Sequence, residues 1–113
     1  MRNAFPLLTF TVIAAGAIAA GRFVAPGGTQ AGAGVNTLGV SRSDAVLNDK
    51  VAVDSMGTAI VQTGAAIAAN ALIETDANGK AITHVSGQIV GRVVPGEVAT
   101  AADQFVEILL LPN

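Results

Sequence analysis

The sequence predicts an all-β domain, a small β-barrel or sandwich built from two related halves, with an extended N-terminal arm. The main observation is an internal repeat: the phrase Ala-Ile-Ala-Ala at residues 17–20 returns 49 residues later, at residues 66–69. Such a repeat constrains the architecture, and two copies are too few for a solenoid. Short apolar segments separated by Gly, Pro and Asn-Gly turn signals also favour a small antiparallel β structure.

The expected elements follow from the alternation of apolar residues and from the breakers between them. A hairpin is predicted around residues 55–57, and a tight turn at residues 76–79, where Gly79 supplies a positive φ angle. Residues 97–103 are expected to form one or two helical turns. The predicted strands cover residues 7–13, 17–25, 35–40, 50–54, 58–62, 66–75, 80–85, 88–94 and 105–111.

The chain is expected to divide into an N-terminal arm, residues 1–13, and a single β-rich domain, residues 14–113. Within the domain, the pseudo-repeat relates residues 14–53 to residues 63–108. In each half, a Gly-centred apolar phrase follows the alanine-rich segment, and an acidic residue precedes the closing apolar strand. These are features of a scaffold and carry no catalytic chemistry.

The composition indicates a weakly charged subunit of an assembly. Apolar residues make up 51% of the chain and charged residues only 12%, against roughly a quarter in ordinary soluble domains. Much of the apolar content is alanine, which buries little area, and contacts between subunits are the usual way to cover such a surface. The net charge of −2 gives no basic footprint for nucleic acid, and the absence of cysteine excludes disulfide and thiolate-metal staples.

The N-terminal stretch resembles two kinds of membrane-directed segment. No charged residue occurs between Arg2 and Arg22, so the stretch is long enough for a membrane span, and its small residues also fit a secretory signal. Against both interpretations, Pro6 and the β-branched residues after it favour an extended chain. Part of the stretch is also the first copy of the repeat. We therefore expect no membrane association and interpret residues 1–13 as an arm that pairs with another element.

The arm supplies the candidate interaction residues. It holds two of the four phenylalanines of the chain, and large apolar side chains cost about 1.5–3 kcal/mol each if they are left in water instead of buried. The backbone of an arm can also add a strand to the edge of a neighbouring sheet. The residues expected at an interface are Phe5, Leu7, Leu8, Phe10, Val12 and Ile13.

The sequence shows no catalytic constellation. His84 is the single histidine, it has no second titratable group beside it in the sequence, and a surface or interface position is expected for it. No serine has the Gly-x-Ser-x-Gly setting of a nucleophile elbow. The Gly79-Lys80 pair lacks the upstream glycine of a phosphate-binding loop, and Gly87 replaces the acid that a calcium loop needs. We predict no enzyme activity, no cofactor, and no catalytic, cofactor-binding or metal-binding residues.

Seven short phrases follow one another in a defined order along the chain. They cover residues 15–24, 38–41, 49–53, 64–67, 76–81, 89–92 and 105–110. In their order and spacing, over residues 9–111, the chain resembles the capsid decoration (cement) proteins of tailed bacteriophages. The individual phrases are patterns of small residues, so the order carries the resemblance.

The resemblance implies a structural subunit that binds the outside of the phage capsid and stabilises it by bridging subunits of the major capsid protein. Its partners would be that protein and further copies of itself, as trimers at three-fold and quasi-three-fold positions, without nucleic acid. It would reside in the host cytoplasm before assembly and on the exterior of the virion afterwards. The six arm residues would then form the capsid or subunit interface.

Two other classes of function compete with this interpretation. An exported adhesin or pilin-like β module is the alternative, and the N-terminal stretch would then be a signal or a donor strand. A small carbohydrate-binding or ligand-binding barrel is disfavoured, because the chain has no Trp or Tyr to stack on a sugar.

Overall fold

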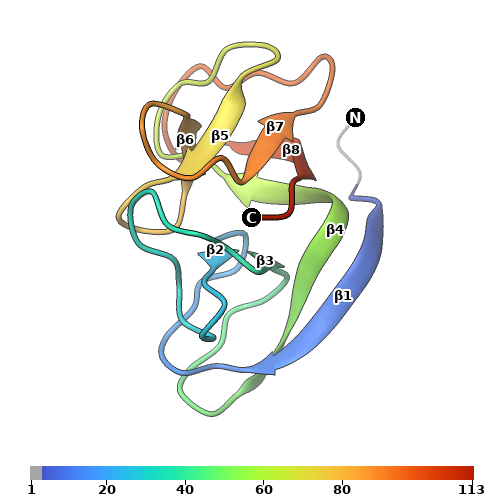
Figure 1. Cartoon of the computed structure of the whole chain (residues 1–113), viewed down its shortest axis with the longest axis vertical. Helices are drawn as coiled ribbons and strands as arrows, with labels where there is room; N and C mark the ends of the chain where they lie inside the picture. The colour runs from blue at the N-terminus through green and yellow to red at the C-terminus, as the bar shows by residue number, and fades with distance from the viewer. Residues whose placement is uncertain (1–3) are drawn as a thin grey trace.

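Eight β-strands form the fold of the computed structural model, which describes residues 4–113 (Figure 1). They are β1 (Pro6–Ile13), β2 (Phe23–Val24), β3 (Gly39–Ser41), β4 (Lys50–Gln62), β5 (Leu72–Thr75), β6 (Ala81–Thr83), β7 (Gly91–Val93) and β8 (Phe105–Leu110). No residue in the described range is helical, so the all-β prediction is confirmed. The helical turns expected at residues 97–103 are wrong, because Ala99 instead exchanges two backbone hydrogen bonds with Ile67.

The strands form an antiparallel sheet that almost closes into a barrel. Seven of them follow the order β2–β3–β4–β8–β7–β5–β6. The two ends of this path approach each other, since the N–H of Phe23 donates to the carbonyl oxygen of Gly79 at 2.8 Å. Thr63, directly after β4, also forms a bridge with Ala81 of β6. The result is a nearly closed seven-stranded barrel, and the eighth strand, β1, pairs with β4 outside this path.

β4 is the long strand that joins the two parts of the sheet, and Figure 1 shows it curving beside β1. Its first part pairs with β1 and β3, and its second part pairs with β8. The predicted hairpin around residues 55–57 is therefore wrong. Gly57 has a φ of 92° and lies where the pairing with β1 shifts register, so the strand bends there and does not reverse.

Two clusters of buried side chains form the core. The larger cluster contains Phe23 and draws on β4, β5, β7 and β8. The smaller one contains Val51 and Val53 of β4, with residues from the segments around β2. The strands approach closely because many of their residues are small. A Cβ at Gly39 of β3, for example, would overlap the carbonyl oxygen of Asp54 in β4, so only glycine fits there.

The two copies of the repeated phrase form isolated bridges, and β2 and β5 begin only after them. Ile18 pairs with Ala45, and Ile67 pairs with Ala99. The strands predicted over residues 17–25 and 66–75 are correspondingly shorter. Each copy has one large buried side chain flanked by alanine and glycine, which favour strands weakly.

β1 contains most of the segment predicted as an N-terminal arm. Residues 1–3 of that segment lie outside the described residues. From Pro6 to Ile13 the strand pairs with β4 along its length, so this part of the segment is an edge strand of the chain's own sheet. The physical reason is Val12, which packs against the smaller core cluster and anchors the strand.

The predicted tight turn lies between β5 and β6, at residues 76–79. Gly79 has a φ of 72°, which confirms the prediction for this residue. Its N–H donates to the carbonyl oxygen of Asp76, and the Asp76 side chain accepts the N–H of Asn78 at 2.8 Å. Gly79 is buried, and a Cβ there would lie 2.9 Å from Cγ of Gln30. The turn is thus packed against the loop between β2 and β3.

Replacing Gly79 by valine is expected to destabilise the protein by about 1 kcal/mol or more. A β-branched side chain is strained in the left-handed region, and it would also crowd Gln30 and the main-chain oxygens of Phe23 and Ala31. Thermal unfolding measures the effect. Gly27→Val is the control, because a Cβ at Gly27 meets nothing within 4 Å and its φ is not positive. An unchanged melting temperature for Gly79→Val would contradict this account of the turn.

Candidate interaction surface

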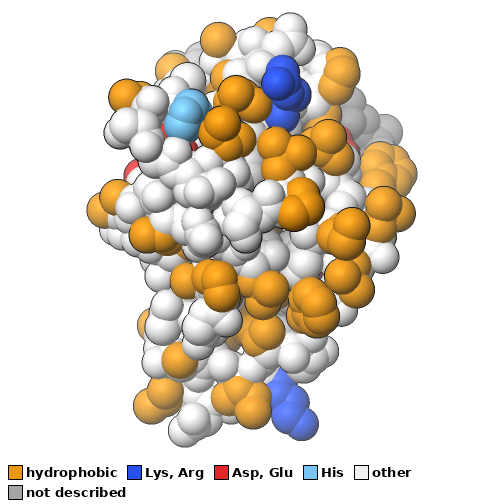
Figure 2. Space-filling view, viewed as in Figure 1, with side chains coloured by type: hydrophobic (Ala, Val, Ile, Leu, Met, Phe, Trp, Pro, Cys, Tyr) orange, Lys and Arg blue, Asp and Glu red, His pale blue; other side chains and the backbone are white. Residues whose placement is uncertain are grey.

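β1 and Phe5, the residue directly before it, bring the six predicted interface residues to one edge of the molecule. Leu7 is 81% exposed and Ile13 is 63% exposed, and Phe5, Leu8 and Phe10 are exposed as well. Val12 is half-buried, because it packs against the smaller core cluster. Figure 2 shows hydrophobic side chains along the side of the molecule where β1 runs in Figure 1. Five large apolar side chains therefore remain in solvent at this edge.

One face of β1 covers the smaller core cluster. Alternate residues of a strand share a face, and Phe10 and Val12 stand opposite Val53 and Val51 of β4, both of which are buried. Phe10 and Leu8 also line an open groove of about 370 Å³. This face is therefore continuous with a concave apolar surface.

The groove is built from segments that are far apart in the sequence. Its apolar walls come from Leu8, Phe10, Pro26, Leu38, Met56 and Pro112. Among the described residues that line it, none is charged. The side chain of Asn113 accepts the N–H of Thr37 at 2.6 Å, which holds the end of the chain against the segment before β3. Such a lining suits apolar side chains of another protein.

The opposite face of β1 carries a polar cluster at Asp54. The hydroxyl of Thr9 donates to Oδ1 of Asp54 at 2.9 Å, and Nε of Arg42 donates to the same oxygen at 2.8 Å. Asp54 is buried, whereas Arg42 is half in solvent. Because a buried carboxylate that loses its partners is strongly destabilising, this cluster holds β1 to β4 in one register.

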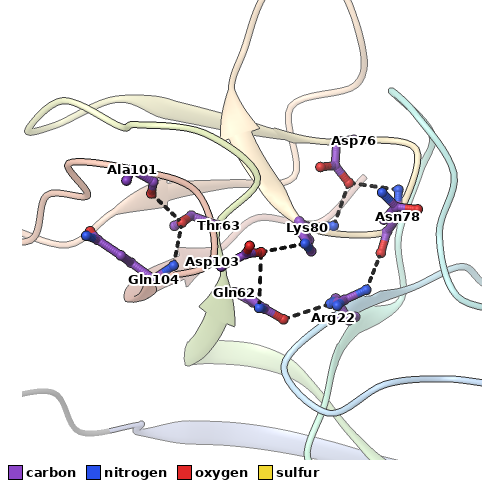
Figure 3. A network of polar contacts seen from close by, with 9 residues as sticks. All are labelled: Arg22, Gln62, Thr63, Asp76, Asn78, Lys80, Ala101, Asp103 and Gln104. Carbon is purple, nitrogen blue, oxygen red and sulfur yellow. Dashed lines mark hydrogen bonds and ion pairs between the residues drawn. The ribbon is translucent and has the colours of Figure 1, made fainter.

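A second polar network, drawn in Figure 3, ties the barrel together near its closing strands. Nε of Arg22 donates to Oε1 of Gln62 at 3.0 Å, and Nη1 of Arg22 donates to the carbonyl oxygen of Asn78 at 3.0 Å. Oδ1 of Asp103 accepts Nζ of Lys80 at 2.5 Å and Nε2 of Gln62 at 3.3 Å. The network joins β4, the β5–β6 turn and the segments before β2 and β8.

This polar network has a structural role. The hydrogen bond from Lys80 and the positive charge of the same side chain lower the pKa of Asp103. The Asp103 side chain is mostly exposed, so solvent screens this ion pair and its contribution to stability is small. The side chains of the network form hydrogen bonds with one another and with the backbone of Asn78. We therefore interpret the network as a set of contacts that stabilises the closed barrel.

His84 is partly exposed and lies beside a carboxylate that the sequence analysis missed. Its Nδ1 is 3.2 Å from Oε1 of Glu74, which is on β5. The same oxygen accepts the N–H of Val85 at 2.7 Å and the N–H of Gly87 at 3.0 Å. The hydrogen bond from Val85 lowers the pKa of Glu74, burial opposes this shift, and Gly87 and His84 lower the pKa further. Glu74 therefore fixes the backbone of the loop between β6 and β7.

The titratable groups and the groove are separate features of the molecule. Neither Glu74 nor His84 lines the groove. Within residues 4–113, no three His, Cys, Asp or Glu side chains gather in a way that could hold a metal ion. The same part of the chain contains no helix capable of spanning a membrane.

These features define a class of protein: a structural β module, held together by polar clusters, with an exposed apolar edge and an apolar groove. The chain belongs to the phage cement protein family, whose model matches residues 2–110. This match confirms the resemblance found in the sequence. The family is structural and non-enzymatic, so the prediction that the chain is not an enzyme is confirmed as well. The protein is a component of the phage capsid.

A solved phage structure has a similar fold. The chain resembles the crystal structure of the head fiber gp8.5 N base in bacteriophage phi29, with a TM-score of 0.75 and 20% sequence identity. The match covers 92% of this chain and 93% of that chain. At this identity the likeness shows the fold alone, and it supports the barrel. No curated protein is significantly similar in sequence.

Proposed function

We propose that this cement protein binds the outer surface of a phage capsid and stabilises the shell by bridging neighbouring subunits of the major capsid protein. The observation that carries the proposal is the apolar edge formed by Phe5 and β1, where five large side chains lie in solvent and no residue of the strand is charged. The proposed interface residues are Phe5, Leu7, Leu8, Phe10, Val12 and Ile13. The protein would pass from the host cytoplasm to the exterior of the virion.

The energetics of such an edge suit attachment in many copies. Full burial of one large apolar side chain contributes about 1.5–3 kcal/mol, and part of this gain is lost when the interface becomes ordered. A shell repeats the same site many times, so modest contacts by each subunit add up over the particle. The groove extends the apolar area that a partner can cover.

Clustering as trimers at three-fold and quasi-three-fold positions is part of the proposed function. The resemblance to decoration proteins favours it. The small number of charged residues, 12% of the chain, supports it physically, because like subunits then repel one another little when they come together.

We also propose that the barrel consists of two related halves within one domain, residues 14–113. The support is a set of equivalent pairings separated by about the repeat distance. These are Val12–Val51 and Val61–Val106, Phe23–Val40 and Leu72–Arg92, and Ile18–Ala45 and Ile67–Ala99. The backbone conformation also supports two related halves, because Gly21 and Asn70, which are 49 residues apart, both have positive φ angles, 72° and 64°.

The predicted pseudo-repeat, residues 14–53 and 63–108, extends further under this proposal. Val12 and Val61 are equivalent, so β1 corresponds to the second part of β4. The N-terminal segment then belongs to the first half as its opening strand, and its apolar outer surface remains available to the shell.

The proposal is tested by replacing two exposed apolar residues of β1 with serine. The double variant Leu7→Ser/Ile13→Ser is expected to bind expanded shells at least about tenfold more weakly, because it removes two side chains that would be buried at the interface. Co-sedimentation with shells measures the occupancy. Point substitutions are preferable to a deletion of residues 1–10, which would remove more than half of β1 and uncover Val53.

The matched control is Val46→Ser/Leu47→Ser, a double variant of two exposed aliphatic residues in the loop before β4. It is expected to bind shells like the unmodified protein, and both double variants should keep the original melting temperature. Normal shell occupancy by Leu7→Ser/Ile13→Ser would rule out the proposed interface. Loss of binding by the control alone would move the interface to the loop before β4.

A further inference from the structure

The outer edge of β1 is open. Among the described residues, β1 pairs with no strand other than β4, and Figure 1 shows it as the outermost strand on its side of the molecule. Ala14, directly after β1, exchanges backbone hydrogen bonds with the segment before β4. Alternation along an antiparallel strand then directs the N–H and C=O groups of Thr9 and Thr11 away from β4. These groups are available to another strand.

This edge lacks the usual protection against pairing with another chain. Exposed edges are commonly blocked by lysine, by proline or by a bulge. β1 has no charged residue, its proline is the first residue, and its irregular pairing lies before Thr9. Within the described residues, the edge is covered from Ile13 onward: a Cβ at Gly28 would lie 2.9 Å from the carbonyl oxygen of Ile13, and the N–H of Ala15 donates to the carbonyl oxygen of Gly28 at 2.9 Å. A regular stretch of edge therefore ends at Ile13.

The sequence of this edge is nearly symmetric about Phe10. Outward from Phe10, the matching residues are Thr9 and Thr11, then Leu8 and Val12, then Leu7 and Ile13. If two copies pair antiparallel about this centre, threonine faces threonine, aliphatic faces aliphatic and no like charges meet. We propose that two copies of this chain pair through β1, antiparallel, around a two-fold axis at Phe10.

The directions of the backbone groups agree with this register. Thr9 of one copy meets Thr11 of the other, and both present their backbone groups outward, as a hydrogen-bonded pair requires. The two copies of Phe10 form the close, non-hydrogen-bonded pair at the axis. Phe10 is 44% exposed in the single chain and lines the groove, so the second ring adds an aromatic contact at the mouth of the groove.

The corresponding edge inside the chain is already covered. Thr58 and Gln62 of β4 lie 49 residues after two outward-facing positions of β1. Their N–H groups donate to the carbonyl oxygens of Phe5 and Gly21, at 3.2 Å and 2.8 Å. Among residues 4–113, no strand pairs with the equivalent edge of β1, and a second copy supplies one.

The biological role of this contact rests on the proposed function. The contact adds to that function a partner for β1, a second copy of the chain. A two-fold contact is isologous and closes on itself, so it does not propagate into fibres. On a shell whose subunits cluster at three-fold positions, pairing through β1 links one cluster to the next.

A cysteine at position 10 tests the pairing. The chain has no cysteine of its own, and residues of a non-hydrogen-bonded pair have Cα atoms about 4.5 Å apart, within the range of a disulfide. The full-length Phe10→Cys variant, in concentrated solution without shells and with a mild oxidant, is expected to form covalent dimers. It should do so about tenfold faster or more than Val85→Cys, an exposed control in the β6–β7 loop.

The register is tested by mixing two further variants. Thr9→Cys and Thr11→Cys should cross-link faster when mixed than either does alone, because these positions face each other across the axis. Equal rates for Phe10→Cys and Val85→Cys, with both variants folded by thermal unfolding, would overturn the proposal. A cysteine at position 10 that couples to the shell protein on particles, but not to a second copy in solution, would also overturn it. That outcome would assign the edge to the shell and leave the proposed capsid binding intact.

Discussion

Replacing Phe23 by alanine is expected to lower the free energy of unfolding by about 3–5 kcal/mol. The ring is fully buried in the larger core cluster. The chain has only four phenylalanines and no Trp or Tyr. The small side chains around Phe23 would fill the cavity left by its ring poorly. The same residue helps to close the barrel, because its N–H donates to Gly79 and its carbonyl oxygen accepts the N–H of Ala31.

Chemical denaturation of Phe23→Ala beside Phe105→Ala measures this effect. Phe105 lies on β8 and is partly exposed, so its removal should cost about 1.5 kcal/mol or less. A loss of 3–5 kcal/mol is a large share of the roughly 5–15 kcal/mol that stabilises a domain. If the two variants lose the same stability, the core is not organised around Phe23 and the account of barrel closure fails.

The strands that the sequence predicts well are those in which alternation continues over several residues. The predicted strands at residues 7–13 and 105–111 correspond closely to β1 and β8. In β8, Val106, Ile108 and Leu110 are buried, while Leu109 is exposed. The alternation in the sequence therefore predicts the core face of the strand. It does not predict that Glu107, on the other face, is also buried, where its carbonyl oxygen accepts the N–H of Val94.

β4 shows why other elements could not be predicted. Gly57 produces the same local signal in a reversing turn and in a bend of a continuous strand. The outcome depends on whether the flanking segments pair with each other or with distant strands, and here they pair with β1, β3 and β8. This information lies in contacts between remote parts of the chain and is absent from any short window of the sequence.

Only part of the interaction surface could be predicted from the sequence, because the rest is formed by contacts between remote parts of the chain. The β1 residues could be proposed because their apolar side chains are consecutive in the sequence. The other walls of the groove, such as Leu38 and Met56, are single apolar residues from separate segments, and such residues carry no signal by themselves. The Glu74–His84 pair had a usable signal, because the Asn78-Gly79 turn folds β6 back on β5 and brings the two residues together.

Glu74→Gln is expected to lower the free energy of unfolding at neutral pH by about 2 kcal/mol. The carboxylate accepts the backbone N–H groups of Val85 and Gly87, and hydrogen bonds to a charged acceptor are roughly twice as strong as those to a neutral one. Glutamine keeps the shape of the side chain and removes its charge. The loss should fall mainly on the loop between β6 and β7, whose backbone this oxygen holds.

The effect of Glu74→Gln should depend on pH with a definite sign. The hydrogen bond from Val85 is the main cause that places the pKa of Glu74 in the folded state below its ordinary value of 4.5. A lowered pKa contributes stability that is complete above pH 4.5 and is lost as the pH falls through the folded pKa. Denaturation curves from about pH 7 downward should therefore show the unmodified protein and the glutamine variant converging in acid. Asp103→Asn is the control: its carboxylate also has a lowered pKa, but it is exposed, so its effect should be small and should fade in high salt. A difference between Glu74→Gln and the unmodified protein that stays constant with pH would show that the charge of Glu74 does not hold the loop.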